Sequence, residues 1–247
     1  MALTKHVADK IHQVTDAFTN WFIVEDGGLT VVDTGFPRSW NSLQDALVEL
    51  KRRPGEIEAV VLTHGHFDHM GFARRAQAEL GVPVWAHEKE VPVVEHPWNY
   101  DHEQPRLKYA LRYPRFLGIF TAMGPQGALF VKGTDKVETY GSQGELDVPG
   151  RPKIVFTPGH THGHCSLHFP DRGALIAGDA VVTLDPYTGH RGPQIVSGAA
   201  TADSKQALDS LSAVAATDAP TVLTGHGNPW RAGAASAADR AREAGPS

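Results

Sequence analysis

The chain contains a single cysteine, Cys165, and therefore cannot form an intrachain disulfide. Its fold does not depend on an oxidising compartment. The sequence also lacks the uninterrupted apolar run of about 18 residues that a membrane-spanning helix requires. Residues 1–16 are polar and charged, without the apolar centre of a secretory signal. These absences predict a cytoplasmic protein that has no membrane partner.

Basic residues are also in deficit. The chain has 23 Lys and Arg against 28 Asp and Glu, which gives a formal net charge of −5 at pH 7. Nucleic-acid-binding surfaces normally show the opposite balance, so we expect no nucleic-acid partner. The apolar fraction of 41% and the charged fraction of 21% are those of an ordinary globular protein. We therefore expect the partner to be a small molecule.

Histidine, in contrast, is abundant, with 14 residues, and one cluster stands out. His64, His66, Asp68 and His69 follow directly after the apolar run 57–62. In an extended segment His64 and His66 point the same way, and a tight turn after the strand lets the other two converge with them. Imidazole and carboxylate suit zinc, and also manganese, iron or cobalt. The cluster predicts a metal site at a strand end.

Hydrophobic periodicity predicts the order of the secondary-structure elements. Residues 21–24 and 29–32 flank Gly27 and Gly28 and have the pattern of a β-hairpin. Helices are expected over 43–50, 72–80 and 203–214 and from about 232. Strands are expected over 59–62 and 83–86, from 137, and over 153–157, 166–169, 174–177 and 221–223. No Gly/Ser-rich or charged linker separates these elements, so we expect residues 1–247 to form one domain.

Residues 88–133 interrupt this order. The segment is rich in aromatic residues, and Pro114 argues against a single long helix within it. One hypothesis is a lid-like insertion that lines a substrate pocket and supplies a cation for an anionic group. The other is a surface insertion packed by its own aromatic side chains. An exposed aromatic insertion would also suit a homodimer interface.

Three further ligand-type residues, His160, Asp179 and His226, follow predicted strands, and each lies beside glycine. Glycine lets the backbone turn sharply and approach a ligand closely. With the first cluster they make seven candidate ligands, which is too many for one tetrahedral zinc but suits two metals that share a carboxylate.

These motifs together resemble those of the metallo-β-lactamase-fold hydrolases. The resemblance rests on residues 64–69, on 158–161, on Gly178-Asp179, on 225–227 and on Asp33-Thr34-Gly35, and it extends over residues 21–230. It implies an α/β (α+β) protein with a four-layer αββα sandwich and a site at one edge between two sheets. It also implies one metal held by His64, His66 and His160, a second held by Asp68, His69 and His226, and Asp179 as the bridge.

Asp179 distinguishes branches of this superfamily. True β-lactamases of the fold usually lack the bridging Asp, whereas glyoxalase II enzymes and N-acyl-homoserine lactonases keep it. The chain ends too soon after His226 for the helical domain of glyoxalase II, and the site Tyr of the lactonases is replaced by Val182, although Tyr187 could substitute for it. The resemblance therefore favours a branch of small hydrolases.

Several residues are candidates for supporting roles. Asp33 could orient a ligand histidine through its free N–H or could cap a turn. In the metallo-β-lactamase-fold family, the residue at the position of His164 is more often structural or a support for a ligand. Tyr187 and His190 are candidates for substrate contact. Asp68 is the candidate catalytic residue, because a carboxylate beside the metals could orient a hydroxide or pass a proton to the leaving group.

The predicted function is hydrolysis of an ester, lactone or thioester by a hydroxide held between two divalent metal ions, with zinc expected and iron or manganese as alternatives. Two other classes stay open. The same ligands loaded with iron support redox chemistry in persulfide dioxygenase-like enzymes of this fold. The second class is a non-catalytic metal-binding module, and the complete ligand set argues against it, because such a module has no need of a bridged site.

We predict that Asp179→Ala loses one of two metal ions and most of the activity, because it removes the shared carboxylate. Elemental analysis of the purified variant and a hydrolysis assay test this. Two metal ions per chain together with full activity would contradict the dinuclear arrangement.

Overall fold

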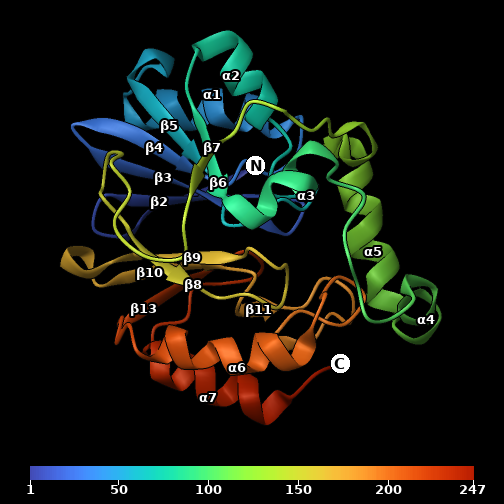
Figure 1. The fold of residues 1–247 in the computed structure, drawn as a ribbon. Helices are drawn as coiled ribbons and strands as arrows, with labels where there is room; N and C mark the ends of the chain where they lie inside the picture. Colours follow the sequence, from blue (N-terminus) through green and yellow to red (C-terminus); the bar gives the residue numbers. More distant parts are fainter.

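The computed structural model describes residues 1–247, apart from the side chain of Phe116. Two β-sheets face each other, and helices cover the outer face of each (Figure 1). Helices α1 (Ser39–Leu50) and α2 (Ala73–Leu80) cover the first sheet, and α6 (Ser204–Ala215) and α7 (Ala234–Ala244) cover the second. This arrangement confirms the predicted four-layer αββα sandwich.

The first sheet has the strand order β1-β2-β3-β4-β5-β6-β7. Its first four strands pair antiparallel, and β4 to β7 pair in parallel. The strands are β1 (Ala2–Ala8), β2 (Ile11–Asp16), β3 (Thr19–Asp26), β4 (Gly28–Val32), β5 (Ile57–Val61), β6 (Val84–His87) and β7 (Glu138–Tyr140). The predicted hairpin therefore corresponds to β3 and β4. The β1–β2 hairpin is an addition that the sequence pattern did not predict.

The second sheet has the order β13-β10-β9-β8, with β10 and β13 parallel. Its strands are β8 (Lys153–Phe156), β9 (Cys165–Phe169), β10 (Ala174–Gly178) and β13 (Thr221–Thr224). Each overlaps a strand predicted from the sequence. A separate antiparallel pair, β11 (Val182–Leu184) and β12 (Arg191–Gln194), was not predicted.

Apolar side chains fill the space between the sheets. Phe22, Val24 and Val61 of the first sheet pack in one cluster with Leu167 and Ile176 of the second. Alternation along each strand sends the intervening residues to the outer faces, where the helices cover them. The apolar stripe of α1 is buried there, as its helical spacing predicts.

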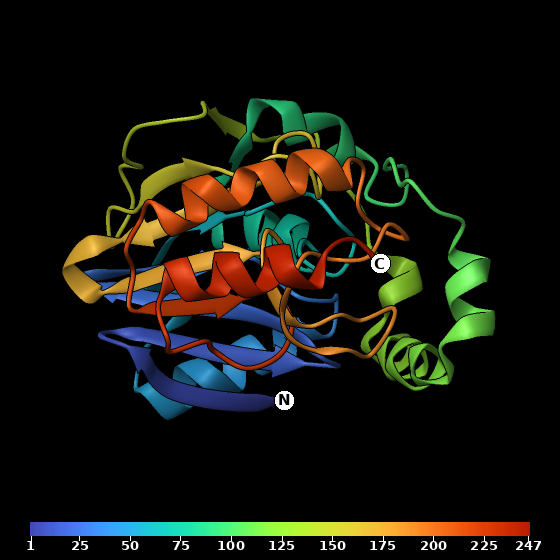
Figure 2. The same ribbon diagram turned by 90° about the horizontal axis from the view of Figure 1, so that it is seen from below.

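The segment 88–133 forms short helices instead of one long one. These are η2 (Glu88–Glu90), α3 (Val91–Glu95), α4 (Arg106–Arg112), α5 (Pro114–Met123), η3 (Gly124–Gln126) and η4 (Ala128–Phe130). Pro114 begins α5, a position at which its missing N–H costs nothing. Helices α4 and α5 stand at one end of the sandwich in two perpendicular views (Figures 1 and 2). The remaining 3₁₀ turns are η1 (Pro54–Glu56) and η5 (Pro170–Arg172).

None of the helices that the structure describes is long and apolar enough to cross a membrane.

Two neighbouring residues of α1 test how much the packing of this outer helix contributes. Leu47 is 1% exposed and Val48 is 77% exposed. We expect Leu47→Ala to lower the free energy of unfolding by about 2–5 kcal/mol, because it leaves a cavity. Val48→Ala, the matched control, should change it by less than about 0.5 kcal/mol. Urea titration measures both; equal effects would contradict the packing described here.

Candidate metal centre

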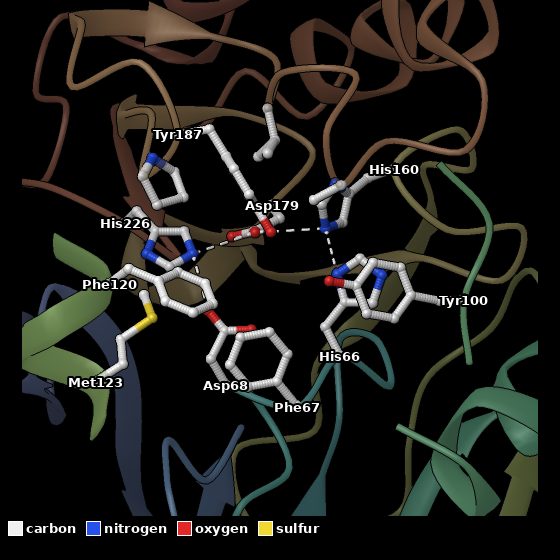
Figure 3. A pocket seen from close by; sticks show the side chains of 13 residues that line it. His66, Phe67, Asp68, Tyr100, Phe120, Met123, His160, Asp179, Tyr187 and His226 are labelled. Atoms are coloured by element: carbon white, nitrogen blue, oxygen red, sulfur yellow. Dashed lines mark hydrogen bonds and ion pairs between the residues drawn. The ribbon is translucent and has the colours of Figure 1, made fainter. Parts of the chain in front are cut away.

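The seven candidate ligands meet at one edge of the sandwich. His64, His66, Asp68 and His69 lie in the loop after β5, His160 lies in the loop after β8, Asp179 directly follows β10, and His226 follows β13. All seven side chains are buried. Figure 3 shows five of them pointing toward one another. Segments far apart in sequence therefore converge on one small volume.

The side chains form two groups. The ligand atoms of His64, His66 and His160 lie within 4.8 Å of one another, and so do those of Asp68, His69 and His226. In the first group, Nδ1 of His66 lies 2.9 Å from Nε2 of His160. Each group offers three donors, so a shared ligand would complete a tetrahedral site, and an additional open position requires five-coordination.

Asp179 lies between the two groups. Its Oδ2 is 3.4 Å from Nε2 of His160 in the first group and 3.4 Å from Nε2 of His226 in the second. Its Oδ1 is 3.6 Å from Nε2 of His69. Burial alone would raise the pKa of Asp179, but the imidazoles of His226 and His69 outweigh it and hold the pKa well below its ordinary value. The carboxylate is thus ionised and reaches both groups.

The hydrogen bonds on the far side of the rings determine which nitrogen faces the site. His226 donates its Nδ1–H to the carbonyl of Phe18 at 2.9 Å. The Thr201 hydroxyl donates to the carbonyl of Val196, so it accepts from Nδ1–H of His160, 3.3 Å away. In both rings Nε2 is therefore the nitrogen that is turned toward the site, as metal ligation requires.

Asp33 orders the first ligand loop in the same way. Its Oδ1 accepts from the Thr63 N–H, and its Oδ2 accepts from the Thr63 hydroxyl and from Nδ1–H of His69, 3.1 Å away. Because the Thr63 hydroxyl donates to Asp33, it accepts from Nδ1–H of His64 at 3.0 Å. Asp33 thus orients His69 directly and His64 through Thr63. Of the two roles weighed for it, the contacts favour the orienting one.

Several polar atoms at the site have no hydrogen-bond partner among the residues that the structure describes. They are buried, and they include Nε2 of His64, His66 and His69 and Oδ1 of Asp179. Burying such atoms unpaired costs free energy. Nε2 of His64 is unprotonated, because its Nδ1–H donates to Thr63 and its pKa is held well below the ordinary value, so a cation is the partner that suits it. The donor set of imidazole nitrogens and carboxylate oxygens therefore fits divalent metal ions.

Burial and charge act differently on the two groups of histidines. Burial and neighbouring imidazoles hold the pKa of His64 well below its ordinary value, and burial lowers the pKa of His160 to about 4. Burial also lowers the pKa of His69, but the carboxylates of Asp179, Asp68 and Asp33 outweigh it and raise that pKa to about 10. The first group is neutral and ready to bind metal, whereas a metal must displace a proton at His69.

His164 supports the site without facing it. Its Nε2 accepts the backbone N–H of Asp179 at 3.0 Å, so its Nδ1–H donates to the Thr157 hydroxyl at 2.9 Å. Burial lowers the pKa of His164 to about 3, which keeps the ring neutral as this pattern requires. Tyr187 and His190, the two candidates for substrate contact, differ in whether they reach the site. Tyr187 lines the pocket over the site, whereas His190 is exposed and lies against the ring of Tyr113.

A pocket opens over the two groups (Figure 3). The segment 88–133 contributes Tyr100, Phe120 and Met123 to its wall, and Tyr100 rests on the ring of His66 with 3.9 Å between ring centroids. No lysine or arginine is among the described residues that line it: His66, Phe67, Asp68, Tyr100, Phe120, Met123, His160, Asp179, Pro186, Tyr187, Val196, Ala200 and His226. The predicted cation for an anionic group is therefore not found in this wall.

Fold and site together define an αββα protein with a histidine- and aspartate-rich centre at the sheet edge. A family model described as the metallo-beta-lactamase superfamily matches residues 14–226. The chain belongs to this superfamily, as its motifs predicted.

Relatives and solved structures agree with this assignment. The "Probable metallo-hydrolase YflN" of Bacillus subtilis is 29% identical over 239 residues, which cover 90% of this chain and 85% of that protein. A hydroxyacylglutathione hydrolase of Synechococcus is 28% identical over 42% of this chain and 37% of its own length. A metallo-beta-lactamase family protein of Thermus thermophilus has the same fold, with a TM-score of 0.68, 22% identity, and coverage of 96% of this chain and 78% of that one.

We predict that Asp33→Asn lowers metal affinity about 10- to 100-fold, because an amide cannot accept all three hydrogen bonds that Asp33 receives. Asparagine tolerates the positive φ of 58° at this position, so the backbone should persist. Competitive titration with a metal chelator measures the affinity. Asp45→Asn, at an exposed position of α1, removes the same charge and should leave the affinity unchanged; a loss there would point to net charge instead of orientation.

Proposed function

We propose that the protein is a metal-dependent hydrolase that uses two divalent metal ions, with zinc as the metal. The observation that carries this proposal is the position of Asp179 between two groups of three donors. A structural metal site has no need of a second group or of a pocket opening onto it. The name of the relative YflN, a metallo-hydrolase, supports the same class.

When two metal ions are bound, they supply Lewis acidity and lower the pKa of water, so that a nucleophile is available at neutral pH. His64, His66 and His160 would hold one ion and Asp68, His69 and His226 the other, with Asp179 shared. Zinc suits this nitrogen- and oxygen-donor set, and imidazole and carboxylate also accept iron or manganese.

Asp68 is the residue that we assign to proton transfer. It lines the pocket, and its Oδ2 lies 3.4 Å from Nε2 of His226. The Thr19 hydroxyl donates to the same oxygen at 3.4 Å and holds the carboxylate in this orientation. Asp68 is thus placed to orient the attacking water and to carry a proton to the leaving group.

The pocket favours a small, uncharged acyl substrate. Its wall is apolar on the side of Phe120 and Met123, and none of the described residues that line it is a lysine or an arginine. A substrate carboxylate that lies away from the metal ions would find no lysine or arginine to pair with among the described residues of this wall, which is costly. A neutral ester, lactone or thioester avoids this cost. One relative, named for hydrolysis of hydroxyacylglutathione, supports an acyl substrate.

The test is hydrolysis by the metal-free and the reloaded protein. Removal of metal with a chelator should abolish hydrolysis of a panel of neutral esters, lactones and thioesters, and zinc should restore it. Iron and manganese are tried in parallel. Matched substrates with a carboxylate on the acyl chain, away from the scissile bond, should have kcat/KM values lower by at least about tenfold. Hydrolysis that survives chelation, or oxygen consumption on a persulfide by the iron-loaded protein, would overturn the proposal.

A further inference from the structure

A buried carboxylate outside the candidate ligand set connects the two sheets beside the site. Glu90 ends the turn η2 after β6 and is 0% exposed. Its Oε2 accepts the backbone N–H of Gly65, and its Oε1 accepts the backbone N–H of Gly163, both at 2.8 Å. One loop follows β5 of the first sheet, and the other joins β8 to β9 of the second.

The two acceptor contacts lie next to candidate ligands. Gly65 is the residue between His64 and His66. Gly163 precedes His164, which accepts the backbone N–H of Asp179, and it lies in the loop that carries His160. One carboxylate thus holds the peptide groups that set the positions of the first ligand group.

The packing around both glycines fits the same role. A Cβ on Gly65 would come within 3.0 Å of Val93 and of the backbone nitrogen of Val94, which follow Glu90 in α3. A Cβ on Gly163 would lie 2.8 Å from Oε1 of Glu90. Both ligand loops are therefore in tight contact with one turn, and a side chain at either glycine would require the turn to shift.

The alternative explanation is that Glu90 stabilises its own helix. It is the N-cap residue of α3, where a carboxylate commonly accepts a backbone N–H of the first turn. Its side chain makes no such capping bond. Burial raises the pKa of Glu90, and the Thr161 hydroxyl together with the N–H groups of Gly65 and Gly163 opposes that rise. The cost of burying this carboxylate is thus offset by the two ligand loops.

We propose that Glu90 is a positioning residue for the metal held by His64, His66 and His160, because it ties their two loops together. The proposal rests on the metal centre of the proposed function and not on any substrate. It predicts that Glu90 determines the affinity of this metal, beyond any effect on folding.

The experiment is a titration of the metal-free protein with Co²⁺, followed by visible absorption and by competition with a chelator. The wild-type chain should bind two Co²⁺ ions. Glu90→Gln keeps the size of the side chain but places an amide NH₂ against one of the two N–H donors. One Co²⁺ should then bind about 10- to 100-fold more weakly, with altered d–d absorption. Glu95→Gln, at an exposed position of α3, is the matched control and should bind as wild type.

Thermal unfolding of the metal-free variants separates positioning from stability. A Glu90→Gln protein that melts at a lower temperature but binds both Co²⁺ ions with wild-type affinity and spectrum would overturn the proposal. If Glu90→Gln does not fold, Glu90→Asp decides: its shorter carboxylate cannot reach both loops, so one Co²⁺ should again be weakened, and wild-type binding would overturn the proposal. A wild-type chain that binds no Co²⁺ would overturn the metal centre itself, whereas an inactive substrate panel leaves this test intact.

Discussion

The carboxylate of Asp179 is the constraint on which the rest of the site depends. It lies between His160 and His226, which come from different loops, and both are 3.4 Å from one of its oxygens. The residues around it leave no space: a Cβ on Gly225 would lie 2.0 Å from its Oδ1. Gly178, directly before it, has a φ of +54°, a conformation that other residues rarely adopt. Glycine is therefore required both before Asp179, at Gly178, and against its side chain, at Gly225, for the two donor groups to share this carboxylate.

Around this centre, much of the buried polar structure serves to orient the ligands. Asp33, Thr201 and the carbonyl of Phe18 each hold the far nitrogen of a histidine ring. Each of these bonds leaves Nε2 as the nitrogen that faces the site, although a metal must still displace a proton from His69. Glu90 and His164 contact the ligand loops through the backbone: Glu90 accepts the N–H groups of Gly65 and Gly163, and His164 accepts that of Asp179. The donors are thus arranged before metal binds.

Secondary-structure elements could be predicted where the hydrophobic periodicity was strong, and the prediction failed where the turns contain unusual residues. Gly27 has a φ of +74°, and the hairpin of β3 and β4 around it was identified from its glycines. The β1–β2 hairpin turns at Lys10, and the β2–β3 turn uses Ala17 and Phe18, all with positive φ. These residues are not typical of such turns, so no local sequence pattern predicted the turns. The polar His12 is buried against Glu25, which also weakened the apolar pattern of β2.

By itself, the sequence determined the fold class and the candidate ligands, because four ligand-type residues in six positions and three Gly-flanked ones each follow a strand. It could not determine which of two roles Asp33 plays, where Tyr187 and His190 lie, or that Glu90 contacts both ligand loops. Those features depend on residues that are distant in sequence, such as Glu90 and Gly163, and no local pattern encodes such a contact. Only the packing of the two sheets brings these groups together. The tertiary structure also places Tyr100, Phe120 and Met123 over the site, and none of the described residues that line the pocket is a lysine or an arginine.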